Sequence, residues 1–380
     1  MRHDQIFTNA RLVLARETVL GTVLVREGRI AELDPGVTAL PGALDLDGDW
    51  LLPGLVELHT DNLERHVMPR PKVSFPMEGA VQAHDAEMAS TGITTVFDAI
   101  GVGDPYGEGF RARDQGMLLE ALDRLEAAGL LRADHLVHVR CELPAPNAQA
   151  LFEPFAGHRR LRLISLMDHT PGQRQWTDLE HARTFYTGRK GWSDAKFDAE
   201  VALAPRRQAE HAMPNRAWFT AFAHAHGVSL ATHDDTTIAH VDEAHALGAG
   251  MSEFPTTLAA AGHAKRLGLC TVAGAPNVVR GGSHSGNVSA LALAQAGLLD
   301  ALSSDYVPSS LLQAAWQLAR EGGFGLAEAV AVVSRNPARA VGLSDRGEIA
   351  IGLRADLVRV RTLADRPFVR EVHVLGRRVA

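Results

Sequence analysis

Cysteine and long apolar runs are scarce in this sequence. Cys141 and Cys270 are the only cysteines among 380 residues, so the chain has no disulfide framework, which is typical of a reducing compartment. Its first residues form no hydrophobic signal core, and no window approaches about 18 uninterrupted apolar residues, the length that a membrane helix needs. We therefore expect a cytoplasmic protein without a membrane partner.

An excess of basic residues is absent as well. The 38 lysines and arginines face 45 acidic residues, which gives a formal net charge of -7. A duplex-binding surface usually needs a basic excess, so the charge argues against nucleic acid as the main partner, and any polyanion must meet a local basic pocket. Hydrophobic residues, in contrast, make up 46% of the chain, enough for one large domain with an appendage or for two domains.

The two ends of the chain share a pattern that the middle lacks. Residues 6–14 and 22–33 alternate between apolar and polar side chains, and residues 356–360 and 369–379 repeat that alternation. Strict alternation is typical of strands with one buried face. Residues 1–50 together with 346–380 are therefore predicted to form one small β-sandwich domain.

The middle of the chain alternates between apolar runs and Ala/Leu-rich helical stretches. The eight runs cover residues 51–59, 93–100, 135–142, 161–169, 228–235, 249–254, 269–274 and 301–305. Eight such units predict an α/β fold, a TIM-like (β/α)8 barrel over residues 51–345; the alternative is a doubly wound open sheet. The barrel is favoured because polar residues end so many of the runs, and a barrel gathers these ends at one face. Residues 176–220 are the least barrel-like part, either a helical excursion with an aromatic seam or a lid over the ligand.

Those strand ends carry candidate metal ligands. His59 and Asp61 end the first run and are two residues apart, so on a strand they point to the same side. The later runs end in further carboxylates and one more imidazole: Glu142, Asp168, His233, Glu253 and Asp305. A single strand-end carboxylate is more often a helix cap or an ion-pair member. Together, however, these donors suit one or two ions of zinc, manganese or iron, and Asp305 is the natural residue to orient or deprotonate a water molecule.

At several points the sequence resembles the amidohydrolase superfamily. The resemblance rests on Pro53-Gly54-Leu55-Val56-Glu57-Leu58-His59, on Asp305, on residues 336–340 and on residues 347–358. Asp61 stands where that superfamily usually has the second histidine of His-x-His, and Glu253 stands where it usually has a histidine after strand six. Glu142 and Asp168 therefore compete with Glu253 as further ligands.

A narrower resemblance rests on five longer segments, which resemble the phosphonate-metabolism branch of that superfamily. They are residues 59–64, 167–175, 232–237, 253–257 and 274–287. The resemblance implies a phosphorylated ribose substrate in the carbon–phosphorus lyase pathway. Water would attack α-D-ribose 1-methylphosphonate 5-triphosphate, releasing diphosphate and leaving the 5-phosphate. The alternatives are hydrolysis of a cyclic amide or a deamination, and a non-catalytic barrel that binds a partner; the oligomeric state stays open, a homo-oligomer included.

A glycine-rich stretch after the seventh run suits the phosphates of such a substrate. Its candidate phosphate-binding residues, with one arginine from the fourth strand end, are Arg280, Gly281, Gly282, Ser283, His284, Ser285 and Arg174. Glycines let backbone N–H groups approach a phosphate, a following helix adds positive potential, and phosphate sites in barrels commonly lie after strands seven and eight. An ordinary Gly/Ser loop with a helix cap is the alternative interpretation.

Overall fold

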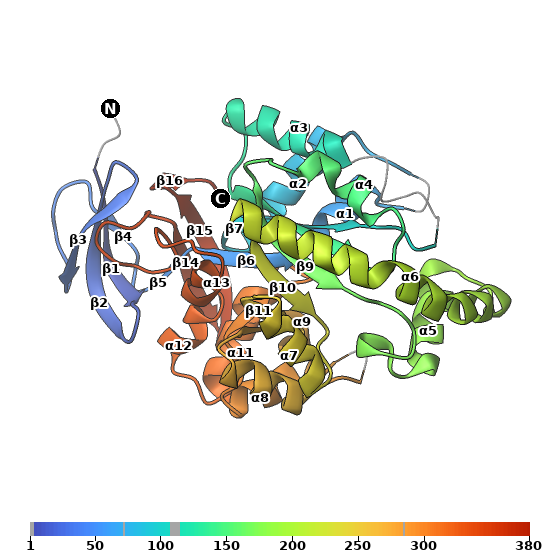
Figure 1. Ribbon diagram of the computed structural model, residues 1–380. Helices are drawn as coiled ribbons and strands as arrows, with labels where there is room; N and C mark the ends of the chain where they lie inside the picture. Colours follow the sequence, from blue (N-terminus) through green and yellow to red (C-terminus); the bar gives the residue numbers. More distant parts are fainter. Residues whose placement is uncertain (1–3, 71–72, 107–114, 284–285) are drawn as a thin grey trace.

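The computed structural model describes residues 4–70, 73–106, 115–283 and 286–380. Within them, eight parallel strands form a nearly closed barrel, and a separate mixed sheet lies at one side (Figure 1). The barrel strands, in chain order, are β6 (Leu55–Thr60), β7 (Ile93–Val102), β8 (Asp134–Glu142), β9 (Leu161–Met167), β10 (Ser229–His233), β11 (Met251–Glu253), β12 (Cys270–Gly274) and β13 (Ala301–Ser303). Each predicted apolar run overlaps one of them, and the predicted barrel is confirmed.

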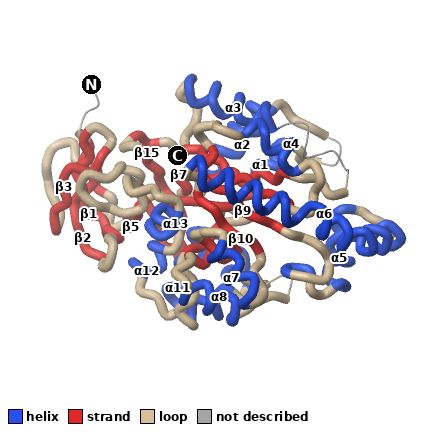
Figure 2. Tube along the Cα trace, viewed as in Figure 1, coloured by secondary structure: helices blue, strands red, loops and turns tan. Residues whose placement is uncertain are grey.

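Helices connect the barrel strands and cover the outside of the barrel (Figures 1 and 2). They are α1 (Asn62–Val67), α2 (Met77–Ser90), α3 (Gln115–Ala127), α4 (Ala148–Phe152), α5 (Leu179–Lys190), α6 (Asp194–His226), α7 (Ile238–Ala246), α8 (Leu258–Arg266), α9 (Ala275–Arg280), α10 (Ala290–Gln295), α11 (Ser310–Glu321), α12 (Leu326–Ala331) and α13 (Arg335–Ala340). The described residues also contain two short 3-10 turns, Glu153–Phe155 and Arg174–Trp176. Because helices cover one face of each strand and the barrel interior covers the other, the strands read as continuous apolar runs.

The barrel closes between its first and last strands. The Asp305 N–H donates to the His59 carbonyl, and the Asp61 N–H donates to the Asp305 carbonyl, both at 3.0 Å. A parallel bridge pairs Thr60 with Asp305. These bonds lie at the carboxyl ends of β6 and β13, so barrel closure also brings together two of the predicted site segments.

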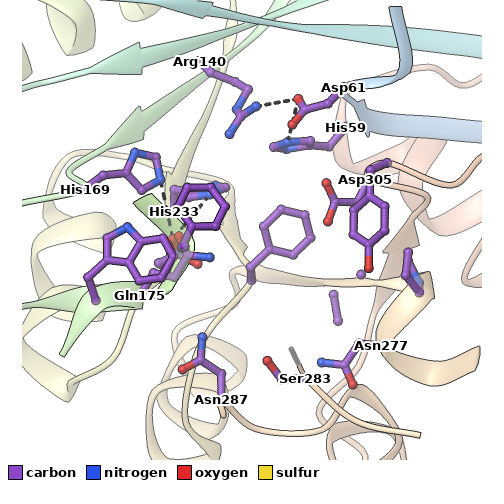
Figure 3. A pocket seen from close by; sticks show the side chains of 18 of the residues that line it. His59, Asp61, Arg140, His169, Gln175, His233, Asn277, Ser283, Asn287 and Asp305 are labelled. Carbon is purple, nitrogen blue, oxygen red and sulfur yellow. Dashed lines mark hydrogen bonds and ion pairs between the residues drawn. The ribbon is translucent and has the colours of Figure 1, made fainter. Parts of the chain in front are cut away.

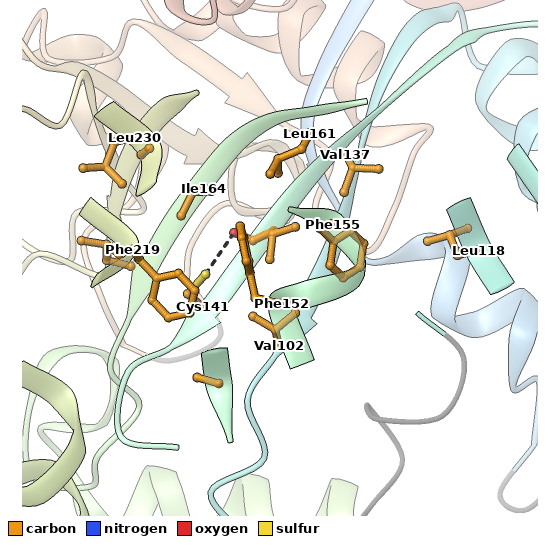
Figure 4. Packing of buried hydrophobic residues seen from close by; sticks show 14 of the residues in the cluster. Val102, Leu118, Val137, Cys141, Phe152, Phe155, Leu161, Ile164, Phe219 and Leu230 are labelled. Carbon is orange, nitrogen blue, oxygen red and sulfur yellow. Dashed lines mark hydrogen bonds between the residues drawn. The ribbon is translucent and has the colours of Figure 1, made fainter. Parts of the chain in front are cut away.

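Alternation along β8 separates packing residues from site residues. Cys141 belongs to a buried apolar cluster between the barrel wall and the helices, where it lies near Phe152 and Phe219 (Figure 4). Its neighbours Arg140 and Glu142 instead line a cavity on the inner side. This is the period of two expected of a strand, so one strand supplies side chains both to the hydrophobic core and to the cavity.

The second sheet contains strands from both ends of the chain. These are β1 (Gln5–Val13), β2 (Thr18–Arg26), β3 (Arg29–Pro35), β4 (Leu44–Asp45), β5 (Trp50–Pro53), β14 (Leu357–Leu363), β15 (Arg366–Val374) and β16 (Arg377–Arg378). Hydrogen bonds join them in a single mixed sheet, in which β5 pairs with both β1 and β14. The buried Arg359 donates to Asp49 at 2.6 Å, which also connects the two ends of the chain.

Helix α6 is 33 residues long and serves two regions. Phe197, near its start, packs in an aromatic cluster with Tyr186 and Trp192, whereas Phe219 and Ala223 belong to the core against the barrel wall. The segment predicted as an insertion over residues 176–220 is therefore continuous with the helix that covers β9 and β10. Among the described residues, no helix combines the length and the apolarity required to cross a membrane.

Candidate active site

A cavity of about 390 Å³ lies at the carboxyl ends of the barrel strands (Figure 3). The ends of all eight strands, or the segments after them, contribute to its wall. Active sites of (β/α)8 barrels lie at this face because the loops after the strands converge there. The cavity is therefore the candidate active site.

Glu253 holds two imidazoles at the base of the cavity. One carboxylate oxygen lies 2.7 Å from His59 Nδ1 and the other lies 2.8 Å from His233 Nδ1. Burial opposes ionisation of Glu253, but the nearby His59 and His138 imidazoles outweigh it and hold the pKa of Glu253 well below its ordinary value. An ionised carboxylate only accepts hydrogen bonds, so both Nδ1 atoms carry hydrogens, and in the neutral form of each ring, the form that binds metal, Nε2 presents a lone pair.

His59, Asp61 and Asp305 form one group of possible metal ligands. One ligand atom from each lies within 4.8 Å of the others. His59 Nε2 is 3.8 Å from the Asp61 carboxylate. Burial and the neighbouring charge of Asp61 raise the pKa of Asp305 to about 6, because two carboxylates that are close together resist ionising together.

His169, His233 and Asp234 form a second group, again within 4.8 Å. One Asp234 oxygen lies 3.5 Å from His233 Nε2 and 3.9 Å from His169 Nε2, and this oxygen is buried without a hydrogen-bond partner among the described residues. A buried carboxylate oxygen left without a hydrogen bond is costly unless a cation satisfies it. Imidazole nitrogens with carboxylate oxygens are donors that zinc, manganese and iron accept, so the residues fit a divalent metal.

Glu142 and Asp168 have different surroundings. Glu142 lines the cavity and accepts from the His169 backbone at 3.0 Å and from its Nδ1 at 2.5 Å, as Glu253 does for the other imidazoles. Asp168 accepts from the Thr170 N–H at 3.1 Å and from Gln208 Nε2 at 2.7 Å. Asp168 belongs to none of the His/Asp/Glu groups found among the described residues, and it is not part of the cavity wall.

Arg140 is a site residue that the sequence reasoning missed. Its Nη1 atom lies 2.5 Å from Asp61, it lines the cavity, and its Nε is buried without a hydrogen-bond partner among the described residues. A signal was available, because Arg140 precedes Glu142 by two residues on β8 and therefore shares its side of the strand.

The predicted phosphate-binding residues divide into two sets. Arg280, Gly282 and Ser283 line the cavity, and Ser283 lies near Asn277 and Asn287 (Figure 3); Gly281 ends α9 with a φ of 80°. His284 and Ser285 lie outside the described residues.

Arg174 does not line the cavity. It is buried, and its Nη1 donates to the His233 carbonyl and to Asp235, both at 2.9 Å. The guanidinium therefore binds the backbone at the end of β10 and supports the strand end that carries His233.

Aromatic residues form the wall on the side of β9. Trp176, Phe185 and Tyr186 come from the segment between β9 and β10, and Tyr106 comes from the segment after β7. The Tyr106 and Tyr186 hydroxyls are 3.1 Å apart. These rings add amphipathic surfaces to a part of the wall that also carries Asp104 and Glu142.

A further buried group, His84, Asp98 and His135, lies away from the cavity. Each Asp98 oxygen is 2.8 Å from one imidazole, and His135 Nε2 is 3.3 Å from Asp85. Burial opposes protonation of His135, but Asp98 and Asp85 outweigh it and raise its pKa to about 10. These atoms satisfy one another, so the group is a buried ion cluster between α2 and the strands.

Three residues at the cavity have left-handed backbones. Asp234 has a φ of 55°, Phe254 of 54° and Asp305 of 55°. The Phe254 ring lies 5.1 Å from the His59 ring and 5.2 Å from the His233 ring, centre to centre. These turns aim the three side chains into the cavity directly after β10, β11 and β13.

A model of the amidohydrolase family matches residues 50–379, and the chain belongs to this family. Over 380 residues it is 45% identical to the α-D-ribose 1-methylphosphonate 5-triphosphate diphosphatase of Escherichia coli (strain K12), with 98% of this chain and 100% of that protein covered.

Solved structures of similar shape include a molinate hydrolase, with a TM-score of 0.66, 15% identity, and 99% of this chain and 94% of that chain covered. Another is the N-isopropylammelide isopropylaminohydrolase of Burkholderia multivorans, with a TM-score of 0.64, 19% identity, and 100% and 98% covered. At these identities the likeness establishes the fold alone.

Proposed function

We propose that this enzyme hydrolyses α-D-ribose 1-methylphosphonate 5-triphosphate to α-D-ribose 1-methylphosphonate 5-phosphate and diphosphate in phosphonate catabolism. The observation that carries the proposal is one cavity in which imidazoles, carboxylates and two arginines face each other, in a chain 45% identical to a diphosphatase with that substrate in its name. The low cysteine content supports a cytoplasmic location.

The two ligand groups would hold one or two divalent ions of zinc, manganese or iron: His59, Asp61 and Asp305 in one, and His169, His233 and Asp234 in the other. A bound divalent ion supplies Lewis acidity toward a phosphoryl oxygen and lowers the pKa of water. Glu253 and Glu142 fix the orientation and tautomer of the imidazoles. Asp168 supports the segment after β9 instead.

Asp305 would accept a proton from the attacking water. With a pKa of about 6 it is mainly ionised at neutral pH, yet it is a stronger base than an ordinary aspartate. Its carboxylate belongs to the same group as His59 and Asp61, so a water that it orients would lie beside the proposed metal ligands.

Two arginines counter the charge of the triphosphate. Arg140 lies among the carboxylates at the cavity wall, where the charge of its guanidinium would stabilise the phosphoryl group under attack. Arg280, with Gly282 and Ser283, suits the diphosphate that leaves, because guanidinium groups bind phosphate in a bidentate manner.

Phosphorus NMR of the metal-supplemented enzyme with α-D-ribose 1-methylphosphonate 5-triphosphate tests the proposal. Diphosphate and the 5-monophosphate should appear together, which places the cut between the α and β phosphorus atoms. An unchanged spectrum with metal bound would reject the diphosphatase activity and turn the search to cyclic amides and deaminase substrates.

A further inference from the structure

Strand β6 contains an extra residue just before the candidate active site. The stretch 57–60 on β6 is paired with the stretch 96–98 on β7, so three steps along one strand match two steps along the other. Leu58 and His59 are left out of the described pairing. Such a bulge interrupts the ladder of backbone hydrogen bonds and re-aims a side chain, and bulges are frequent next to active sites.

Buried side chains satisfy the peptide group between Leu58 and His59. The Leu58 carbonyl accepts from His138 Nδ1 at 2.9 Å. The His59 N–H donates to a Glu57 oxygen at 2.6 Å. All four residues are buried, so neither backbone group can turn to water instead, and an unpaired buried backbone group is costly. The bulge therefore depends on these two side chains.

His138 reaches this peptide group from the interior of the barrel. Alternation along β8 places it on the same side as Arg140 and Glu142. Its Nε2 atom is 2.9 Å from Ser165 Oγ on β9, and its ring meets the His59 ring edge-on, with centres 5.1 Å apart. A carbonyl only accepts hydrogen bonds, so His138 Nδ1 carries a hydrogen and Nε2 faces the serine hydroxyl. One imidazole thus connects β6, β8 and β9.

Glu57 extends the same support to the last barrel strand. Its second oxygen accepts from the Ser304 N–H at 2.6 Å. The next residue, Asp305, donates from its N–H to the His59 carbonyl at 3.0 Å. His59 is thus held at its N–H, at its carbonyl and, through Glu253, at its ring. A shift of the bulge would move His59 relative to Asp305, although both belong to one candidate ligand group.

We propose that His138 is a positioning residue for the candidate metal ligand His59. Its Nδ1 hydrogen holds the Leu58 carbonyl, which keeps the bulge in register and His59 Nε2 directed toward the candidate metal site. Without this hydrogen bond the bulged peptide can slip toward the regular register, and a slip of one residue turns side chains to the other face. The inference rests on the proposed function for its effect on turnover, whereas its effect on metal affinity needs no substrate.

Two substitutions of His138 separate the Nδ1 hydrogen bond from the filling of space. The asparagine amide nitrogen is bonded to Cγ, as Nδ1 is in histidine, and can donate to the Leu58 carbonyl; the glutamine amide nitrogen lies one bond further out, as Nε2 does. His138→Gln should therefore weaken Zn²⁺ binding about 10-fold, measured by competition with a chromophoric chelator. His138→Asn should stay within about threefold of wild type, although it is the smaller side chain and leaves the larger cavity.

The order of the two affinities decides the role. Equal losses, a larger loss in His138→Asn, or no loss in either variant would overturn it. The same exchange at another buried imidazole of β8, His135→Gln, is the matched control, because its partners Asp98 and Asp85 lie away from the cavity. Its Zn²⁺ affinity should match that of wild type; a loss as large as in His138→Gln would show that any change in β8 disturbs the site and would overturn the role as well.

Turnover separates this inference from the proposed function. With α-D-ribose 1-methylphosphonate 5-triphosphate and saturating metal, His138→Gln should lower kcat about 10-fold and keep KM within about twofold of wild type, because His138 is not part of the cavity wall. A loss confined to KM would contradict the positioning role. Wild-type enzyme that binds Zn²⁺ yet leaves the triphosphate intact would reject the proposed function, while the order of the Zn²⁺ affinities still decides the role of His138. Wild-type enzyme that binds no Zn²⁺ would overturn the inference itself.

Discussion

The Glu253→Gln substitution should leave two imidazoles in different tautomers, whereas a single carboxylate now holds both in the same tautomer. Glutamine has the same shape, but its amide offers one acceptor where the carboxylate offers two. The amide oxygen can accept from only one of the two Nδ1 atoms, which lie 2.7 and 2.8 Å from Glu253 in His59 and His233. The amide NH₂ group then faces the other imidazole, whose proton must move to Nε2, and that ring loses its ligand lone pair.

The magnitude follows from the loss of one outer hydrogen bond to one ligand. Such partners are worth about 10- to 100-fold in metal affinity, or about 1.4 to 2.7 kcal/mol. Competition with a chromophoric chelator measures this affinity directly, and kcat/KM should fall by a similar factor. Asp242→Asn is the matched control, because Asp242 pairs with His263 at 2.6 Å outside the cavity wall.

Metal affinity within about threefold of wild type in Glu253→Gln would refute the tautomer argument, since threefold is well below the expected loss. A loss as large in Asp242→Asn would show that any carboxylate–imidazole change weakens the fold as a whole. In either case Glu253 would not be an orienting residue for the site.

Three further predictions concern single residues. Asp305→Asn should lower kcat about 100- to 10,000-fold with KM nearly unchanged, because the base is lost; steady-state kinetics decide, and near-normal kcat would refute the role. Arg280→Met should instead raise KM for the triphosphate, and a change confined to kcat in the same assay would argue against phosphate binding. His135, with its pKa raised to about 10, stabilises the fold fully below about pH 6.5, and this contribution is lost as the pH rises through 10. Between pH 7 and 10, the free energy of unfolding measured with urea should therefore fall by at most about 1.4 kcal/mol per pH unit, and this fall should be absent in His135→Gln. The same dependence on pH in the wild type and the variant would contradict the ion cluster.

The sequence predicted the barrel because its signal is local and repeated. Each strand is a short apolar run between helical stretches, and a parallel strand covered on both faces must look that way. The structure confirms the barrel, and the family match and the close relative confirm the predicted family. The metal and phosphate residues stay predictions, although most of the proposed ligands lie at one cavity.

For residues beyond the last hydrogen-bonded position of a strand, the sequence does not predict which side chains face the cavity. Asp168 and His169 are neighbours just after β9, and the loop geometry, rather than the period of two, decides that His169 faces the cavity. Arg174 illustrates a second limit, because its partner Asp235 is distant in sequence and a basic residue near a strand end can bind a neighbouring carboxylate as well as a ligand. Arg140 was overlooked because a lone arginine within an apolar run carries no motif of its own.

The left-handed backbones of Asp234, Phe254 and Asp305 have an evolutionary consequence. Such conformations cost non-glycine residues about 1 to 3 kcal/mol each, most for a bulky side chain such as phenylalanine. Glycine would relieve that cost, so selection for heat resistance alone favours glycine at these three positions, although their side chains point into the cavity. Lineages of this enzyme that adapt to high temperature must therefore gain stability in the helical layer or the mixed sheet, leaving these strand ends as they are.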